Sequence, residues 1–123
     1  MAKILIHLTH GPSAPTQADR AFLIAKTAVE EGHQVSMFLA GEAVELIKDE
    51  NLDKTLGVGV TAVPLKNSVD AIISGGGRIV LSKVSCGARN VGDGDLVNKD
   101  VELGMPNELV KMTVEHDKVI TYG

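Results

Sequence analysis

The order of apolar and polar residues along the chain predicts alternating strands and helices. Nearly unbroken apolar runs are typical of strands covered on both faces, and they occur at residues 3–9, 33–39, 79–84 and 118–122. Apolar stripes with a helical period occur at residues 15–31, 65–74 and 106–115. A short helix over residues 42–48 and an irregular loop over residues 49–64 complete the clearer part of the pattern.

The first long helix carries signals at both of its ends. Pro15 suits the first helical position, and Gly32 is a natural stop. Thr16 and Asp19 have the spacing of a capping box, in which side chains bond the free N–H groups of the first turn. The side chains predicted to face inward are Ala18, Phe22, Ala25 and Val29 in this helix, and Leu109, Val110 and Met112 in the last one.

This alternation predicts the fold class. Strands joined by helices pair in parallel through right-handed crossovers, so we expect a three-layer α/β/α sandwich around a mostly parallel, about five-stranded sheet of flavodoxin-like type. Residues 86–104 are the least regular region, in which a short turn of helix and a brief strand at residues 101–103 are expected. The length of 123 residues is that of one domain, expected to span residues 1–123.

Composition narrows the classes of function. The chain is 44% hydrophobic but only 2% aromatic, and its net charge is −4. A base-stacking platform needs aromatic side chains, and a nucleic-acid or anionic-membrane surface needs a basic face. We therefore expect no direct nucleic-acid binding and no membrane binding. A single cysteine is compatible with a reducing compartment, so a cytoplasmic location is expected.

Candidate chemistry gathers in three loops that follow predicted strands. In an open parallel sheet, ligands bind outside the carboxyl ends of the strands, and the loops there are residues 9–13, 40–41 and 85–91. His10 lies in the first loop and Cys86 in the third. The loops are expected to form a small polar cleft, with the further cleft residues Thr9, Gly11, Gly41, Ser85, Gly87 and Asn90.

Cys86 is the only cysteine, so any redox chemistry it performs must involve another molecule. A free thiol has a pKa near 8.5, which helix N-termini and nearby cations lower. If residues 87–89 open a helical turn, their N–H groups would face the sulfur and Arg89 would add positive charge. The alternative is a buried, inert cysteine beside a surface arginine.

The segment from Cys86 to Val91, with the sequence Cys-Gly-Ala-Arg-Asn-Val, resembles the Cys-x-x-Arg-Gly-hydrophobic signature of the DsrE/TusD/YchN-like (DsrE/DsrF-like) sulfur-relay family. The resemblance extends over nearly the whole chain, including residues 38–41 and 117–122. Asn90 departs from the family's usual glycine, although asparagine also tolerates the left-handed backbone conformation. The resemblance implies a DsrE-like fold, assembly into trimers or hexamers, and a persulfide on Cys86 passed between partner proteins.

These observations leave several functions open. The first is a sulfur carrier or sulfurtransferase-like protein, in which Cys86 receives sulfur from a donor and hands it to an acceptor thiol, with Arg89 stabilising charge and His10 orienting the donor or acting as a base. The second is a non-catalytic oligomeric subunit that binds a small ligand or regulates, with Cys86 merely lining the cleft. An acyl-transfer pair of Cys86 and His10 would need an orienting acid and an oxyanion hole that the sequence does not indicate.

The remaining patterns predict neither a metal nor a cofactor. The spacing of His7 and His10 would point their rings to opposite faces of a strand. With a single cysteine, a structural zinc site is not expected.

Overall fold

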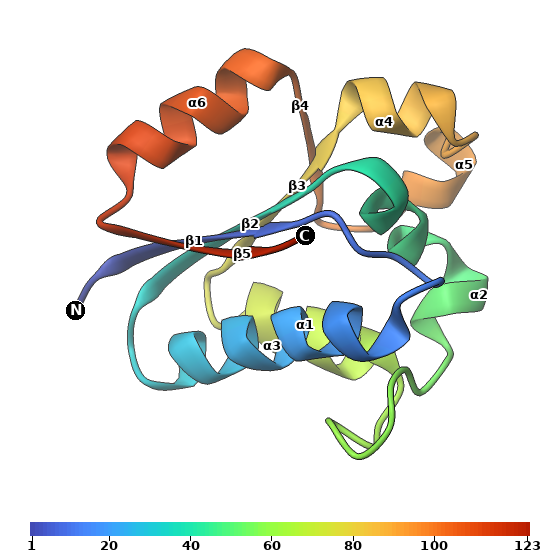
Figure 1. Ribbon diagram of the computed structural model, residues 1–123, viewed down its shortest axis with the longest axis horizontal. Helices are drawn as coiled ribbons and strands as arrows, with labels where there is room; N and C mark the ends of the chain where they lie inside the picture. The colour runs from blue at the N-terminus through green and yellow to red at the C-terminus, as the bar shows by residue number, and fades with distance from the viewer.

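Five parallel strands form the centre of the molecule, in the spatial order β4-β3-β2-β1-β5 (Figure 1). The computed structural model describes residues 1–123. The strands are β1 (Lys3–Leu8), β2 (Gln34–Leu39), β3 (Arg78–Ser82), β4 (Glu102–Gly104) and β5 (Lys118–Tyr122). The prediction of a parallel sheet of about five strands is confirmed.

Helices cover both faces of this sheet, which confirms the three-layer architecture. Helices α1 (Pro15–Glu30) and α3 (Leu65–Ser74) lie against one face, and α6 (Pro106–Glu115) lies against the other (Figure 1). The shorter helical segments are the 3₁₀ helix η1 (Gly41–Ile47), α2 (Asp49–Leu52), α4 (Lys83–Ala88) and α5 (Asp93–Leu96). Thus part of the segment expected to be an irregular loop, residues 49–52, is helical.

The two faces of the sheet have cores of unequal size. The main core, on the side of α1 and α3, contains 22 buried residues, among them Ile6 and Leu8 of β1. Because side chains alternate along a strand, Leu5 points to the opposite face. There it joins Phe38, Val80 and Met112 in a small core under α6. A single helix therefore covers the second face of the five-stranded sheet.

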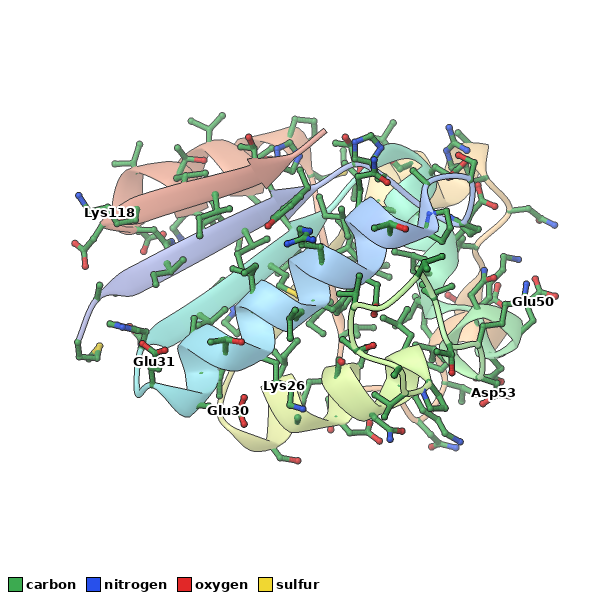
Figure 2. The ribbon with its side chains drawn as sticks, turned by 60° about the horizontal axis from the view of Figure 1, so that its bottom comes forward. Lys26, Glu30, Glu31, Glu50, Asp53 and Lys118 are labelled. Carbon is green, nitrogen blue, oxygen red and sulfur yellow. The ribbon has the colours of Figure 1, made fainter.

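Most charged side chains lie on the surface of these layers, and Asp19 is a buried exception. Figure 2 shows four exposed examples, Glu30 and Glu31 at the end of α1 and Glu50 and Asp53 at α2. No helix combines the length and the apolar composition that a membrane span requires.

In the helix α6, one of the three side chains predicted to face inward does not do so. Met112 is buried and Leu109 packs against the small core, as expected. Val110, however, is 64% exposed. Val110 lies two residues from Met112, about 200° around the helix, and therefore cannot share its inward face.

The predicted capping box at the start of α1 is wrong. The N-cap position is Ala14, no side chain caps the first turn, and Pro15 begins the helix as predicted. Asp19 is instead completely buried and accepts hydrogen bonds from the loop before α3. Its carboxylate accepts hydrogen bonds from the backbone N–H of Thr61, at 3.2 Å, and from the Thr61 hydroxyl, at 2.9 Å. Asp19 therefore fastens the loop before α3 to the first long helix.

We expect Asp19→Ala to lower the free energy of unfolding by about 2 kcal/mol, because hydrogen bonds to a charged group are lost and the Thr61 donors lose their partner. Urea denaturation measures the change, and faster hydrogen exchange at the Thr61 amide would locate it in the loop. Gln17→Ala, at an exposed position of the same helix, should change stability by less than about 0.5 kcal/mol. Equal effects of the two substitutions would contradict the fastening role of Asp19.

Candidate functional site

The structure brings together the loops that follow β1, β2 and β3. The backbone N–H of Gly41 donates a hydrogen bond to the Ser85 hydroxyl at 2.8 Å, which joins the second loop to the third. Gly11 lies so close to Glu42 that a Cβ atom there would fall 2.3 Å from the Glu42 carbonyl oxygen. The Thr9 carbonyl lies beside Gly41, 3.8 Å from where a Cβ would stand. Thr9, Gly11, Gly41 and Ser85, which come from all three loops, therefore lie at one edge of the sheet.

Cys86 lies inside α4, which corrects the local structure expected around it. The strand β3 ends at Ser82, and the Ser82 hydroxyl caps the following helix by accepting a hydrogen bond from the Ser85 N–H. Gly87 and Ala88 are the last residues of this helix rather than the first turn of a new one. Their N–H groups are therefore not free to face the sulfur.

The end of α4 explains why asparagine is acceptable at position 90. Asn90 has φ of 57°, in the left-handed region. The Val91 N–H then donates to the Cys86 carbonyl at 3.0 Å. Of the two hydrogen bonds that define a Schellman helix end, this is the one that spans more residues. The expectation that Asn90 adopts the left-handed conformation is confirmed, and the turn places Val91 in the main core.

The thiol of Cys86 is buried rather than exposed to solvent. The residue is 4% exposed and belongs to the main hydrophobic core. Burial raises the pKa of the Cys86 thiol, and the negative charge of Asp95 raises it further. The expected lowering of this pKa is therefore wrong for the closed structure, in which the thiol stays protonated at neutral pH.

Arg89 is paired with a carboxylate of another element and not with the Cys86 sulfur. Its Nη1 atom donates to the Glu45 carboxylate of η1 at 2.8 Å. The guanidinium thus links the end of α4 to η1 and leaves the thiol without the adjacent cation expected from the sequence. The side chains of Arg89 and Glu45 are 40% and 32% exposed, so this ion pair is a surface contact.

Two lysines add further links between η1 and the segment formed by residues 83–96, which we call the α4–α5 cover. The Lys48 Nζ donates to the Asn90 carbonyl at 3.0 Å and lies 3.6 Å from the Asp95 carboxylate. The Lys99 Nζ, just beyond the cover, donates to the carbonyl oxygens of Ile47 and Asp95. The cover is therefore held over the main core by charged and polar groups.

Glu42 is a residue of this edge that the sequence reasoning missed. Its carboxylate accepts hydrogen bonds from the Ser13 hydroxyl at 2.7 Å and from the Ser13 N–H at 2.8 Å. These bonds hold the pKa of the Glu42 carboxyl below its usual range, and the positive charge of Arg89 adds a smaller effect in the same direction. Glu42 directly follows Gly41, which belongs to one of the three loops predicted to hold the site, and this position could have identified it from the sequence.

The two histidines of β1 and its loop have separate surroundings. No hydrogen bond joins His10 to the Cys86 thiol or to any other side chain. The ring of His7 lies edge-on to Phe38, with ring centroids 6.1 Å apart, and its Nε2 is buried without a partner. Burial lowers the pKa of His7. No group of three or more His, Cys, Asp or Glu side chains is arranged to hold a metal ion.

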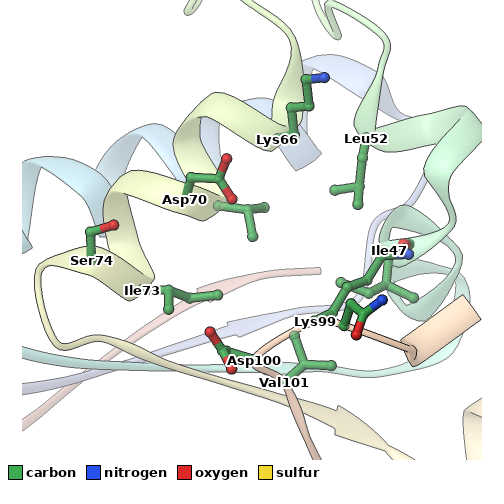
Figure 3. A pocket seen from close by; sticks show the side chains of 11 residues that line it. Ile47, Leu52, Lys66, Asp70, Ile73, Ser74, Lys99, Asp100 and Val101 are labelled. Atoms are coloured by element: carbon green, nitrogen blue, oxygen red, sulfur yellow. Dashed lines mark hydrogen bonds between the residues drawn. The ribbon is translucent and has the colours of Figure 1, made fainter.

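A cavity of about 370 Å³ lies apart from this edge of the sheet, between α3 and the connection from α5 to β4 (Figure 3). Aliphatic side chains of Ile47, Leu52, Val69, Ile73 and Val101 form part of its wall. Cys86 is not among the residues that line it. The sequence reasoning missed this cavity because its walls come from segments far apart in the chain.

The raised pKa of Cys86 predicts how stability depends on pH. An unfolded cysteine ionises near pH 8.5, whereas the folded thiol keeps its proton to higher pH. Above pH 8.5 the unfolded chain binds fewer protons, so the free energy of unfolding should fall as pH rises, by at most about 1.4 kcal/mol per pH unit from this group.

Urea denaturation of the wild type and of Cys86→Ala, from about pH 7 to pH 10, measures this effect. The gap in stability between the two proteins should narrow as pH rises, because the variant lacks the titrating thiol. A gap that stays constant or widens would contradict the raised pKa.

Comparison with known proteins adds a family and a fold. The family model that describes the DsrE/DsrF-like family matches residues 2–122. Comparison with curated proteins gives no sequence match.

Several solved structures share the fold. The YchN protein of E. coli superposes with a TM-score of 0.82 at 22% sequence identity, covering 99% of this chain and all of that one. A conserved protein of unknown function from Bacteroides thetaiotaomicron, BT1422, has a TM-score of 0.71 at 14% identity, covering 98% of this chain and 94% of that one. The protein MTH1491 from Methanobacterium thermoautotrophicum, also of unknown function, has a TM-score of 0.68 at 11% identity, covering 98% and 99%.

Proposed function

Because the chain belongs to the DsrE/DsrF-like family, we propose that it is a cytoplasmic sulfur-relay protein that carries a persulfide on Cys86. The observation that carries this proposal is the position of the only thiol. Cys86 follows β3 at the carboxyl edge of the sheet, within a short helix that is hydrogen-bonded to the loop after β2. This is the edge at which parallel sheets bind their ligands.

Loading requires little chemistry beyond an ionised thiol. The Cys86 thiol gives up its proton, and the thiolate attacks the outer sulfur of a donor persulfide. A bond forms between the Cys86 sulfur and that outer sulfur, while the S–S bond of the donor breaks and its electron pair leaves with the donor thiolate, which takes up a proton. An acceptor thiolate then attacks the outer sulfur on Cys86, and Cys86 leaves as the thiolate.

Because Cys86 is only 4% exposed, loading would require the α4–α5 cover to open first. The links that hold it include the surface pair of Arg89 and Glu45, and such a pair contributes only about 0–1 kcal/mol. Opening would hydrate the thiol and lower its pKa, since burial is the main cause of the raised value. It would also release Arg89, one helical turn from Cys86, to stabilise the thiolate or the persulfide. His10, at the same edge, would orient the donor or act as the base.

We also propose that copies of the chain associate into a trimer or hexamer, with donor and acceptor proteins, or small sulfane donors, as further partners. Exposed aliphatic side chains on β4, on α6 and at the residue between them support association, because exposed apolar surface leaves water when a second surface covers it. These are Leu103, Met105, Val110 and Val114, which are between 44% and 80% exposed.

A second function has its own observation in favour of it. The burial and raised pKa of Cys86, with Arg89 engaged by Glu45, suit a subunit that binds a small ligand or regulates a partner, and in which Cys86 has a packing role. In that case the chain would bind without transferring sulfur.

Intact mass separates the two functions. After incubation with polysulfide, thiosulfate or a persulfidated protein donor, the wild type should gain the mass of one or more sulfur atoms, and a thiol reductant should remove it. Cys86→Ser, which keeps the shape of the side chain and removes the sulfur, should gain nothing. If no donor loads the wild type, the carrier function is wrong and the binding function is favoured.

A further inference from the structure

The cavity between α3 and the α5–β4 connection has a composition typical of small-molecule sites. Such sites have volumes of about 300–1,000 Å³, largely apolar walls and a few polar groups that fix orientation. This cavity, of about 370 Å³, combines the five aliphatic side chains named above with polar groups on two facing walls. Figure 3 shows Asp70 on the α3 wall and Asp100 on the facing wall.

The two cations of the cavity are already engaged. The Lys99 Nζ, at a side chain only 16% exposed, donates to the Asp49 carboxylate at 2.9 Å and to the carbonyl oxygens of Ile47 and Asp95. An ammonium group has three N–H donors, so Lys99 has none left for a ligand. The Lys66 Nζ lies 3.5 Å from the Asp53 carboxylate at the outer rim. Each lysine charge is therefore balanced by a carboxylate that does not line the cavity.

The two carboxylates of the cavity have no partner. Asp70 and Asp100 are both exposed at the mouth of the cavity, and neither accepts a hydrogen bond from a side chain or forms an ion pair, in contrast to the paired Asp49 and Asp53. The remaining polar lining residues, Ser74 and Asn98, are uncharged. The charge balance at the cavity is thus negative, beside an aliphatic wall.

We propose that this cavity binds a small organic cation with an aliphatic stem, of the alkylammonium class. The stem would lie against the wall formed by residues such as Val69, Ile73 and Val101, where it leaves water. The ammonium group would donate charge-assisted hydrogen bonds to Asp70 and Asp100, which are stronger than bonds between neutral groups. An anion of the same length would meet the same two carboxylates, with Lys99 fully engaged and Lys66 paired with Asp53 at the rim, so its binding is opposed by charge.

The test uses the full chain labelled with ¹⁵N and titrated with n-pentylamine. The amide signals of Ser74, Asn98, Asp100 and Val101 should shift and saturate, whereas pentanoate and pentanol, at the same concentrations, should cause much smaller shifts. Asp70→Asn and Asp100→Asn should each weaken amine binding about tenfold or more, since each removes one charge while keeping the size of the side chain. Asp93→Asn, at an exposed carboxylate of α5 outside the cavity, should bind the amine as the wild type does.

Three results would overturn the proposal. The first is binding of pentanoate that is as tight as that of the amine or tighter. The second is unchanged amine binding in both cavity variants. The third is the absence of a saturable shift of the cavity amides at up to about 10 mM amine, a concentration above the roughly millimolar dissociation constant of even a poor specific site. The proposal does not rest on sulfur transfer, so Cys86→Ser should bind the amine with unchanged affinity.

Discussion

The packing of α4 against η1 is the interaction on which the chemistry of this protein depends. It places the only thiol on the inner side of a short helix, inside the main hydrophobic core and almost out of contact with water. A sulfur in that position is a weak nucleophile, because the neutral form is favoured over the thiolate. Any reaction at Cys86 therefore begins with a change at this contact.

The contact combines two kinds of interaction with different strengths. Cys86 and Val91 contribute apolar burial, whose loss costs on the order of 25 cal/mol for each Å² exposed. The Arg89–Glu45 pair and the Lys48 links lie near solvent and contribute less. Such an arrangement favours the closed state while keeping local opening well below the cost of global unfolding. For a persulfide carrier, closure would protect a reactive sulfur between transfers.

A further polar link, made by the half-buried Lys99, connects the cover to the rest of the molecule. Lys99 lines the cavity and also bonds the carbonyl oxygens of Ile47 in η1 and Asp95 in α5. Lys99 thus links the cavity to the α4–α5 cover, without touching the thiol.

Much of the fold could be predicted from local pattern, because buried parallel strands and amphipathic helices leave regular signatures. Parallel topology then places the ends of β1, β2 and β3 at one edge, and this also predicted the location of Cys86. The start of helix α4 at Lys83 could not be predicted from the pattern, because Val84 extends the apolar run of β3. The cap by the Ser82 hydroxyl gave no signal either, because it depends on backbone geometry. The partner of Asp19 was missed for a similar reason, because Thr61 lies in a loop 42 residues away whose path is set by tertiary packing.

The environment of the thiol was the least predictable part of the site. Arg89 lies one turn from Cys86 in sequence, but its partner Glu45 belongs to another element, and only the folded chain shows which contact is made. The cavity is a further example, because α3 and residues 98–101 meet across it without any shared motif.

The rate at which an alkylating reagent labels Cys86 in the folded protein tests this account most directly. Glu45→Gln removes the charge that holds Arg89 and should speed labelling several-fold, while Glu102→Gln, which breaks the exposed pair with Arg78 at the opposite end of β3, should leave the rate unchanged. Labelling in native conditions should also be faster than global unfolding allows. Equal rates in the two variants, or labelling only through global unfolding, would contradict the view that a weakly held cover controls access to the sulfur.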